Sequence, residues 1–112
     1  MQFELGLRCK NGEFIMNAGV CKIKLHLPDS HSLKEKRRIV RSMTSKLRNQ
    51  YNISIAEVDD QDLWQIATIG LCCVSNSHGH VDETIGHIMN FIRQSYPEIE
   101  IVDYDTEVMQ GF

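Results

Sequence analysis

The stretch Val20–Glu35, VCKIKLHLPDSHSLKE, combines two patterns that decide the fold. Apolar residues occupy every second position of Cys21–Leu27, with basic side chains between them, which is typical of a half-buried strand that Pro28 ends. Ser32 and Glu35 then stand three residues apart, the spacing of a capping box at the start of a helix. The sequence therefore predicts a strand followed closely by a helix.

The same two periodicities continue through the rest of the chain. The predicted elements are a strand over 20–27, a helix over 33–50, strands over 53–58 and 63–74, a helix between Ser77 and Pro97, and a strand over 99–108. The order strand, helix, strand, strand, helix, strand is that of the split βαβ, or ferredoxin-like, arrangement of the α+β class. We therefore expect a four-stranded antiparallel sheet with both helices on one face.

Composition places the chain among soluble globular proteins of one domain. It has 112 residues, 42% of them hydrophobic and 24% charged, with a net charge of −3. The longest apolar run, Ile69–Val74, is too short to span a bilayer, and no secretory leader is evident. The cysteines form no C-x-x-C pair, and the adjacent Cys72 and Cys73 should point to opposite faces of a strand. We expect reduced cysteines, no membrane association and a cytoplasmic location.

Residues 1–15 differ from the periodic part of the chain. The codons for Gly12 and Glu13 can contain a ribosome-binding motif a short distance before the codon for Met16. We expect Met16 to be the physiological start, residues 1–15 to be a non-native or disordered leader, either translated or a product of a misassigned start, and residues 16–112 to form the single domain. The alternative is a genuine N-terminal strand, because Phe3, Leu5 and Leu7 alternate with other residues.

Three motifs resemble those of the bacterial YlxP-like family of unknown function. They are Ser30–Arg38 (SHSLKEKRR), Ala56–Gln65 (AEVDDQDLWQ) and Val74–Asn76 (VSN), and the likeness extends over Gly19–Val108. The resemblance implies a ferredoxin-like fold and genes often placed among transcription-elongation, translation-initiation and ribosome-maturation factors. It therefore hints at work on RNA or the ribosome. Asp60 stands where the resemblance would place a histidine, so no metal or proton-transfer role is carried over.

The first helix is strongly basic. Residues 33–50 hold seven Lys and Arg against one acid, a local balance of +6. Cations in a first helical turn oppose the helix dipole, whereas free amides and basic side chains together attract phosphate. The alternative is a solvated face whose charges pair with Asp29, Glu35 or the acidic segments. The residues predicted to bind an anion or RNA are His31, Lys34, Arg37, Arg38, Arg41 and Arg48.

Carboxylates gather at 57–62 and along the last strand. Such clusters can hold Mg²⁺ or supply an acid/base pair, which leaves open an enzyme using Asp59, Asp60 or Asp62. An Asp-rich stretch is also a good turn, and acids on an edge strand discourage pairing with other strands. The histidines lack the spacing of a zinc site, and no nucleotide-binding or nucleophile motif occurs. We expect no catalytic residue, no metal and no cofactor.

The sheet face away from the helices should be bare. Its outward positions on the third strand are expected to include Trp64, Ile66 and Cys72, although the opposite register, with Ala67 and Ile69 outward, is possible. Either register exposes apolar side chains, which favours a partner or a homodimer through this face. Only Trp64 could stack on a base, so an RNA-recognition-motif surface is not expected.

Two functions remain after these observations. The first is a non-enzymatic, cytoplasmic RNA- or ribosome-associated accessory factor that binds phosphates with its basic helix. The second is a dimeric protein-interaction or small-ligand module that binds no nucleic acid.

Overall fold

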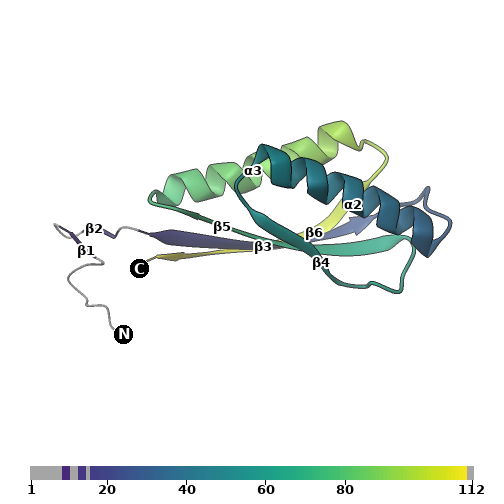
Figure 1. Ribbon diagram of the computed structural model, residues 1–112, viewed down its shortest axis with the longest axis horizontal. Coiled ribbons are helices and arrows are strands. Elements are labelled where there is room, and N and C mark those ends of the chain that lie inside the picture. The colour runs from purple at the N-terminus through teal and green to yellow at the C-terminus, as the bar shows by residue number, and fades with distance from the viewer. Residues whose placement is uncertain (1–8, 11–12, 15, 111–112) are drawn as a thin grey trace.

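The computed structural model describes residues 9–10, 13–14 and 16–110. A short ladder pairs β1 with β2, and the remaining strands form one sheet covered by two helices (Figure 1). The elements are β1 (Cys9–Lys10), β2 (Glu13–Phe14), β3 (Asn17–His26), α2 (Leu33–Gln50), β4 (Ser54–Asp59), β5 (Ile66–Ser75), α3 (His78–Ser95) and β6 (Glu100–Gln110).

The larger sheet has the strand order β4-β5-β3-β6, and every neighbouring pair is antiparallel. From β3 onward the chain runs strand, helix, strand, strand, helix, strand, with α2 and α3 on the same face of the sheet (Figure 1). The structure thereby confirms the predicted ferredoxin-like architecture. The central strands are β5 and β3, and the edges are β4 and β6.

The core lies between the helices and the inner face of the sheet. Alternate residues of β3 and β5 are buried there, and the apolar stripes of both helices cover them. Ala67, Ile69, Leu71 and Cys73 all point inward, which confirms the first of the two registers considered for this strand. Cys72, next to Cys73, is exposed, so the two thiols do lie on opposite faces.

Several strand boundaries differ from the sequence prediction: β3 begins at Asn17 and not at Val20, β6 ends at Gln110 and not at Val108, and the start of β5 bears on the site. β5 begins at Ile66, whereas the apolar pattern predicts a start at Leu63. Leu63 and Trp64 instead belong to the turn between β4 and β5, and both side chains are exposed. The reason is tertiary, because the backbone of this turn is held by a buried lysine of α2 rather than by a neighbouring strand.

The predictions for residues 1–15 fall largely outside the described part of the chain. The ladder of β1 and β2 involves only Cys9–Lys10 and Glu13–Phe14, and the alternation over 3–7 is not among the described residues. The leader at 1–15 therefore stays a prediction.

Candidate functional site

The start of α2 is capped by its own side chains. The Ser32 hydroxyl accepts a hydrogen bond from the Glu35 amide at 3.1 Å, as the capping-box spacing predicts. The Glu35 carboxylate reaches back one residue further than in an ordinary capping box, and it accepts from the His31 amide at 2.7 Å. Two backbone donors at this end of the helix are therefore already satisfied, and the Glu35 carboxylate is used by His31.

Lys36, a base of the first turn that is not among the predicted anion-binding residues, is unavailable to an anion. Its side chain is completely buried, and its Nζ donates to the carbonyl oxygens of Asp60 at 2.8 Å, Gln61 at 3.3 Å and Ile66 at 3.0 Å. The Glu57 carboxylate lies 2.8 Å from the same nitrogen and balances its charge. Lys36 therefore fixes the turn between β4 and β5 against α2 and binds no external ligand.

A signal for this role is present in the sequence. Lys36 stands four, seven and eleven residues before Val40, Met43 and Leu47, which is the spacing of the buried stripe of the helix. Its place on an apolar face was missed because a lysine is rarely buried without a partner, and the partner, Glu57, lies on another element.

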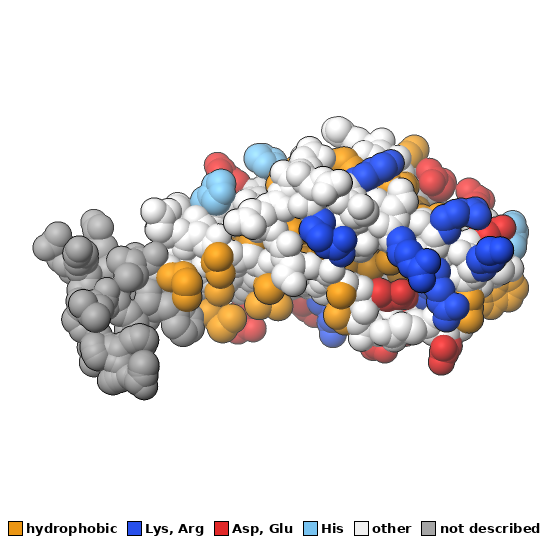
Figure 2. All heavy atoms as spheres, viewed as in Figure 1, with side chains coloured by type: hydrophobic (Ala, Val, Ile, Leu, Met, Phe, Trp, Pro, Cys, Tyr) orange, Lys and Arg blue, Asp and Glu red, His pale blue; other side chains and the backbone are white. Residues whose placement is uncertain are grey.

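Four other bases of α2 are exposed and form what we call the basic flank. These are Lys34, Arg37, Arg38 and Arg41. Within the described part of the chain, none of them forms an ion pair with a carboxylate. Figure 2 shows blue Lys and Arg side chains gathered over α2. The structure thus brings together the central four of the six residues predicted to bind an anion.

Arg48 extends this flank but is partly engaged. Its side chain is exposed, and its Nη2 donates to the carbonyl oxygen of Ile55 in β4 at 3.2 Å. Arg37, Arg41 and Arg48 stand at i, i+4 and i+11, which places them on one stripe of the helix. Because Arg48 reaches β4, this stripe lies on the side of α2 next to the β4 edge of the sheet.

The opposite side of α2 carries a different base. The Lys46 ammonium lies 5.6 Å from the ring centroid of Tyr96, at the end of α3, in a cation–π contact. Lys46 therefore faces α3 and is not part of the basic flank.

The Asp-rich turn is organised by hydrogen bonds among its own residues. Asp60 has a backbone φ of 61°, in the left-handed region that Asp tolerates better than most side chains. Its amide donates to the Asp59 carboxylate at 2.8 Å, and its own carboxylate accepts from the Thr68 hydroxyl at 2.6 Å. Among the described residues no group of three or more His, Cys, Asp or Glu side chains is placed to hold a metal ion.

The outer face of the sheet carries stripes of opposite charge. Lys22 and Lys24 on β3 lie opposite Asp105 and Asp103 on β6, and the register continues to His26, whose ring contacts Glu100 at 2.9 Å. A shallow cavity of about 270 Å³ opens there between the lysines, the β6 acids and the Asp-rich turn. Its lining contains both basic and acidic side chains, so it favours neither an anion nor a cation as a ligand.

The residues predicted for a partner face are spread along β5. Ile66 is half-buried at its start, Cys72 is exposed six residues later, and Trp64 precedes the strand. Cys72 lies across from Val20 on β3, and exposed Val74 follows on the same face. The apolar surface around Cys72 is therefore separate from the start of the strand at Ile66, about 20 Å away at the rise of a strand, and from Trp64 in the turn before it.

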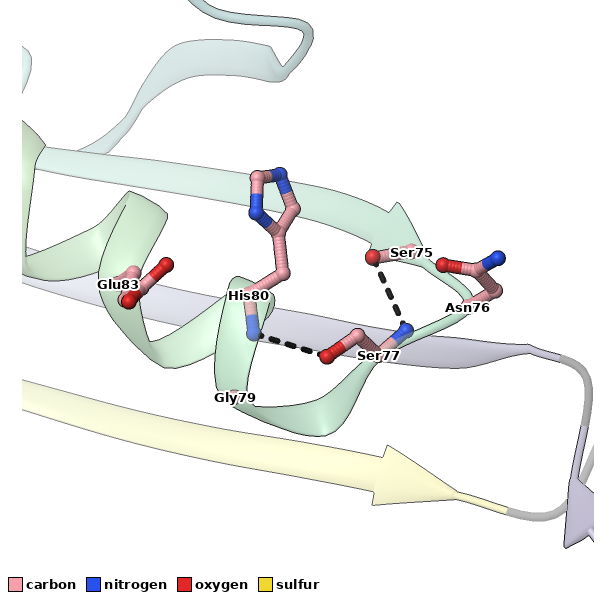
Figure 3. Close-up of a pocket in the computed structure, with 6 residues that line it drawn as sticks. All are labelled: Ser75, Asn76, Ser77, Gly79, His80 and Glu83. Atoms are coloured by element: carbon pink, nitrogen blue, oxygen red, sulfur yellow. Dashed lines mark hydrogen bonds between the residues drawn. The ribbon is translucent and has the colours of Figure 1, made fainter.

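The start of α3 forms a second depression, shown in Figure 3. Ser77 caps the helix by accepting from the His80 amide at 3.4 Å, and the Ser77 amide donates to the Ser75 hydroxyl at 3.1 Å. His80 and Glu83 lie on the first turns of the helix, where the His80 imidazole points away from the Ser77 hydroxyl and Glu83 lies further along the helix (Figure 3). Both serine hydroxyls are thus used to begin the helix.

Two thiols in the core are held in the protonated form. Burial raises the pKa of Cys21, although a hydrogen bond from the Thr106 hydroxyl at 3.5 Å partly opposes it. Burial also raises the pKa of Cys73, with the neighbouring Cys72 adding to the effect. These cysteines therefore behave as small core residues and not as nucleophiles.

Neither helix in the described residues has the length and apolar character needed to cross a membrane.

Comparisons with known proteins agree on a family without an assigned activity. A family model described as "Protein of unknown function (DUF503)" matches residues 18–106. The Bacillus subtilis (strain 168) protein called "Uncharacterized protein YlxP" is 34% identical over 82 residues, which are 73% of this chain and 88% of the Bacillus protein.

Solved structures similar to this chain include two designed proteins. Foldit4 has a TM-score of 0.50 at 9% identity, covering 82% of this chain and 96% of its own. The design LFR1 1, described as having a ferredoxin fold, has a TM-score of 0.43 at 12% identity over 85% of each chain. At these identities the likeness concerns the fold alone.

Proposed function

We propose a function for this chain from the premise that it belongs to the DUF503 family, whose function is unknown, as its three sequence motifs indicated. It acts as a non-enzymatic, cytoplasmic accessory factor that binds RNA, or RNA on the ribosome, through phosphate contacts of the basic flank. Lys34, Arg37, Arg38 and Arg41 make these contacts. Arg48 extends the surface beside β4, and His31 lies at its start.

One observation carries this proposal. Four cations are exposed on one side of α2 with no carboxylate partner in the described chain, although the protein as a whole is acidic. Lys34 and Arg37 stand near the positive end of the helix dipole, where a cation costs some tenths of a kcal/mol. Folding stability does not explain why cations stand at these positions. Binding of a phosphate backbone does explain it, because each contact between a cation and a phosphate releases bound counterions.

The direct test is co-sedimentation of the protein with ribosomal subunits and with purified RNA. We expect the wild type to sediment with at least one of them, and the double variant Arg38→Glu/Arg41→Glu to remain in the supernatant. A matched control is Lys46→Glu/Arg93→Glu, which makes the same change in charge on the far side of α2 and on α3. The control should sediment like the wild type.

According to the proposal, RNA or ribosome binding is lost only when residues of the basic flank are substituted. Circular dichroism first verifies that all three proteins are folded. Equal sedimentation of the folded Arg38→Glu/Arg41→Glu variant and the wild type would contradict the proposal. Equal loss in both double variants would reduce the effect to net charge and would contradict it as well.

A second candidate function has its own observation. Val20, Cys72, Val74 and Met109 expose apolar side chains on the outer face of the sheet, a surface that suits a second copy of the chain or another protein. In this alternative the chain is a dimeric interaction module without nucleic-acid binding. Sedimentation equilibrium tests it: a dimer that Val74→Lys converts to monomer supports it, and a wild-type monomer at about 100 µM, far above an ordinary dimer Kd, rejects it.

A further inference from the structure

Trp64 is exposed on a segment of backbone that the protein holds firmly. Its side chain is 50% exposed and lies outside the core, although an indole is among the most favourable groups to bury. On one side of it, the carbonyl groups of Asp60 and Gln61 accept from buried Lys36. The indole is therefore exposed on a turn whose backbone conformation is fixed by hydrogen bonds.

Gln65, which follows Trp64, is also fixed by hydrogen bonds. The Gln65 side chain donates to the carbonyl oxygens of Pro28 at 3.3 Å and Ser30 at 3.1 Å, and its own carbonyl accepts from the Leu27 amide at 2.8 Å. These contacts join the turn to the segment that leads into α2. The turn between β4 and β5, which carries Trp64, lies at the same end of the molecule as the first turn of α2 (Figure 1).

The basic flank begins at that end. Lys36, whose ammonium group holds the turn, lies between Lys34 and Arg37 in sequence, and both of these neighbours are exposed. Proteins that bind single-stranded nucleic acid combine aromatic side chains with a positively charged surface, and this end of the molecule carries both an exposed aromatic residue and exposed cations. The cations follow the phosphates, and the aromatic ring stacks on a base.

We infer that the ligand of this surface is single-stranded RNA, with one unpaired base stacked on Trp64 and the adjoining phosphates on the basic flank. This inference rests on the proposed function and specifies its ligand. In an A-form duplex the faces of the bases are already stacked on each other, so an indole on a protruding turn has no base face to contact. Phosphates alone would use the cations and leave Trp64 unexplained.

Trp64 also supplies the measurement, because it is the only tryptophan of the chain. The wild type is titrated with a ten-nucleotide oligouridylate, a blunt RNA duplex of the same length and inorganic polyphosphate. We expect the single strand to quench the indole fluorescence and to bind more tightly than the duplex. Polyphosphate should compete for the cations without quenching.

Variants then assign the stacking to this residue. By fluorescence anisotropy of the labelled single strand, Trp64→Ala should weaken binding about 5- to 150-fold, the range that corresponds to one stacked base. Trp64→Phe should retain most of the affinity. Leu63→Ala, which shortens the equally exposed neighbour, should change it less than about twofold, a change within the spread of ordinary surface substitutions.

The outcomes separate this inference from the proposal on which it rests. If no RNA binds, or if binding ignores Arg38→Glu/Arg41→Glu, the proposed function fails and the inference fails with it. If binding depends on those arginines but neither quenches the indole nor responds to folded Trp64→Ala, only the stacking inference is overturned. Tighter binding of the duplex, or quenching by self-association without RNA, overturns it too.

Discussion

Lys36 lies in the first turn of α2 with its whole side chain inside the protein and four oxygen atoms around its ammonium group. A buried charge is tolerated only when it is paired and fully hydrogen-bonded, as it is here. The sequence places Lys36 on the buried stripe of the helix, but it contains nothing that pairs it with Glu57, because that contact joins residues from different elements. This is why periodicity alone could not separate the structural lysine from the exposed ones.

Removing the ammonium group should destabilise the fold strongly. We expect Lys36→Met to lower the free energy of unfolding by about 3–5 kcal/mol, since it leaves Glu57 without its ion-pair partner and removes one hydrogen-bond donor from each of three carbonyl groups. Urea denaturation measures the change. Lys34→Met, two residues away and exposed, is the matched control and should change stability by less than about 0.5 kcal/mol. Equal effects of the two substitutions would refute the structural role of Lys36.

The buried thiols make stability depend on pH. The folded state raises the pKa of Cys21 and Cys73, so the unfolded chain loses these protons first as pH rises. Their contribution is therefore fully present below the ordinary thiol pKa of about 8.5 and is lost as pH rises through the higher folded values. Between pH 7.5 and 10 the wild type should lose more unfolding free energy than Cys21→Ala/Cys73→Ala does. An equal loss in both proteins would show that other groups cause the decrease in stability at alkaline pH.

At the scale of the elements, strand alternation and helical spacing predict every element of the main sheet and its helices. The ends of the elements depend on tertiary contacts that the pattern does not contain: Leu63 and Trp64 continue an apolar pattern, yet they lie in a turn because Lys36 and Gln65 hold the backbone there. The basic flank is likewise visible as a set of residues in the sequence. Its position beside β4 is not, because that depends on how α2 packs on the sheet.

The packing of α3 on β3 depends on a residue without a side chain. A Cβ built on Gly19 would lie 2.3 Å from a methyl carbon of Val81, so the helix can approach the strand this closely only at a glycine. We expect Gly19→Ala to lower the free energy of unfolding by about 1–3 kcal/mol through overpacking. Thermal denaturation followed by circular dichroism measures it.

Gly86 provides the control for that substitution. It is a helical glycine of α3, and a Cβ added to it would meet no atom of another element within 4 Å, so Gly86→Ala should stabilise the helix by up to about 1 kcal/mol. A stability loss in Gly86→Ala as large as that in Gly19→Ala would contradict the steric explanation.

At the scale of the whole molecule, charge is separated across the sheet. The basic flank lies on the side of the β4 edge, where the end of β4 and the turn after it also expose Asp59 and Asp62, whereas β6 at the opposite edge has no Lys or Arg and carries the acids Glu100, Asp103, Asp105 and Glu107. The net charge of −3 conceals this separation. If the proposed function holds, we expect a polyanion to be attracted by the basic flank and repelled by β6, which would orient it before contact.

This separation predicts chromatographic behaviour that net charge does not. At pH 7 and low salt the acidic protein should bind a heparin column, and Arg38→Glu/Arg41→Glu should abolish retention. The control Lys46→Glu/Arg93→Glu, which has the same net charge, should elute near the wild type. Elution of both variants at the same salt concentration would mean that the flank has no special affinity for polyanions.

The position of β3 in the sheet has a consequence for synthesis. This strand comes early in the main sheet, yet one of its two neighbours, β6, is the last element among the described residues, with Asn17 paired to Gln110. During translation one edge of β3 stays open until almost the whole domain has left the exit tunnel. We therefore expect the sheet to be completed late in synthesis, in one step in which β6 pairs with β3.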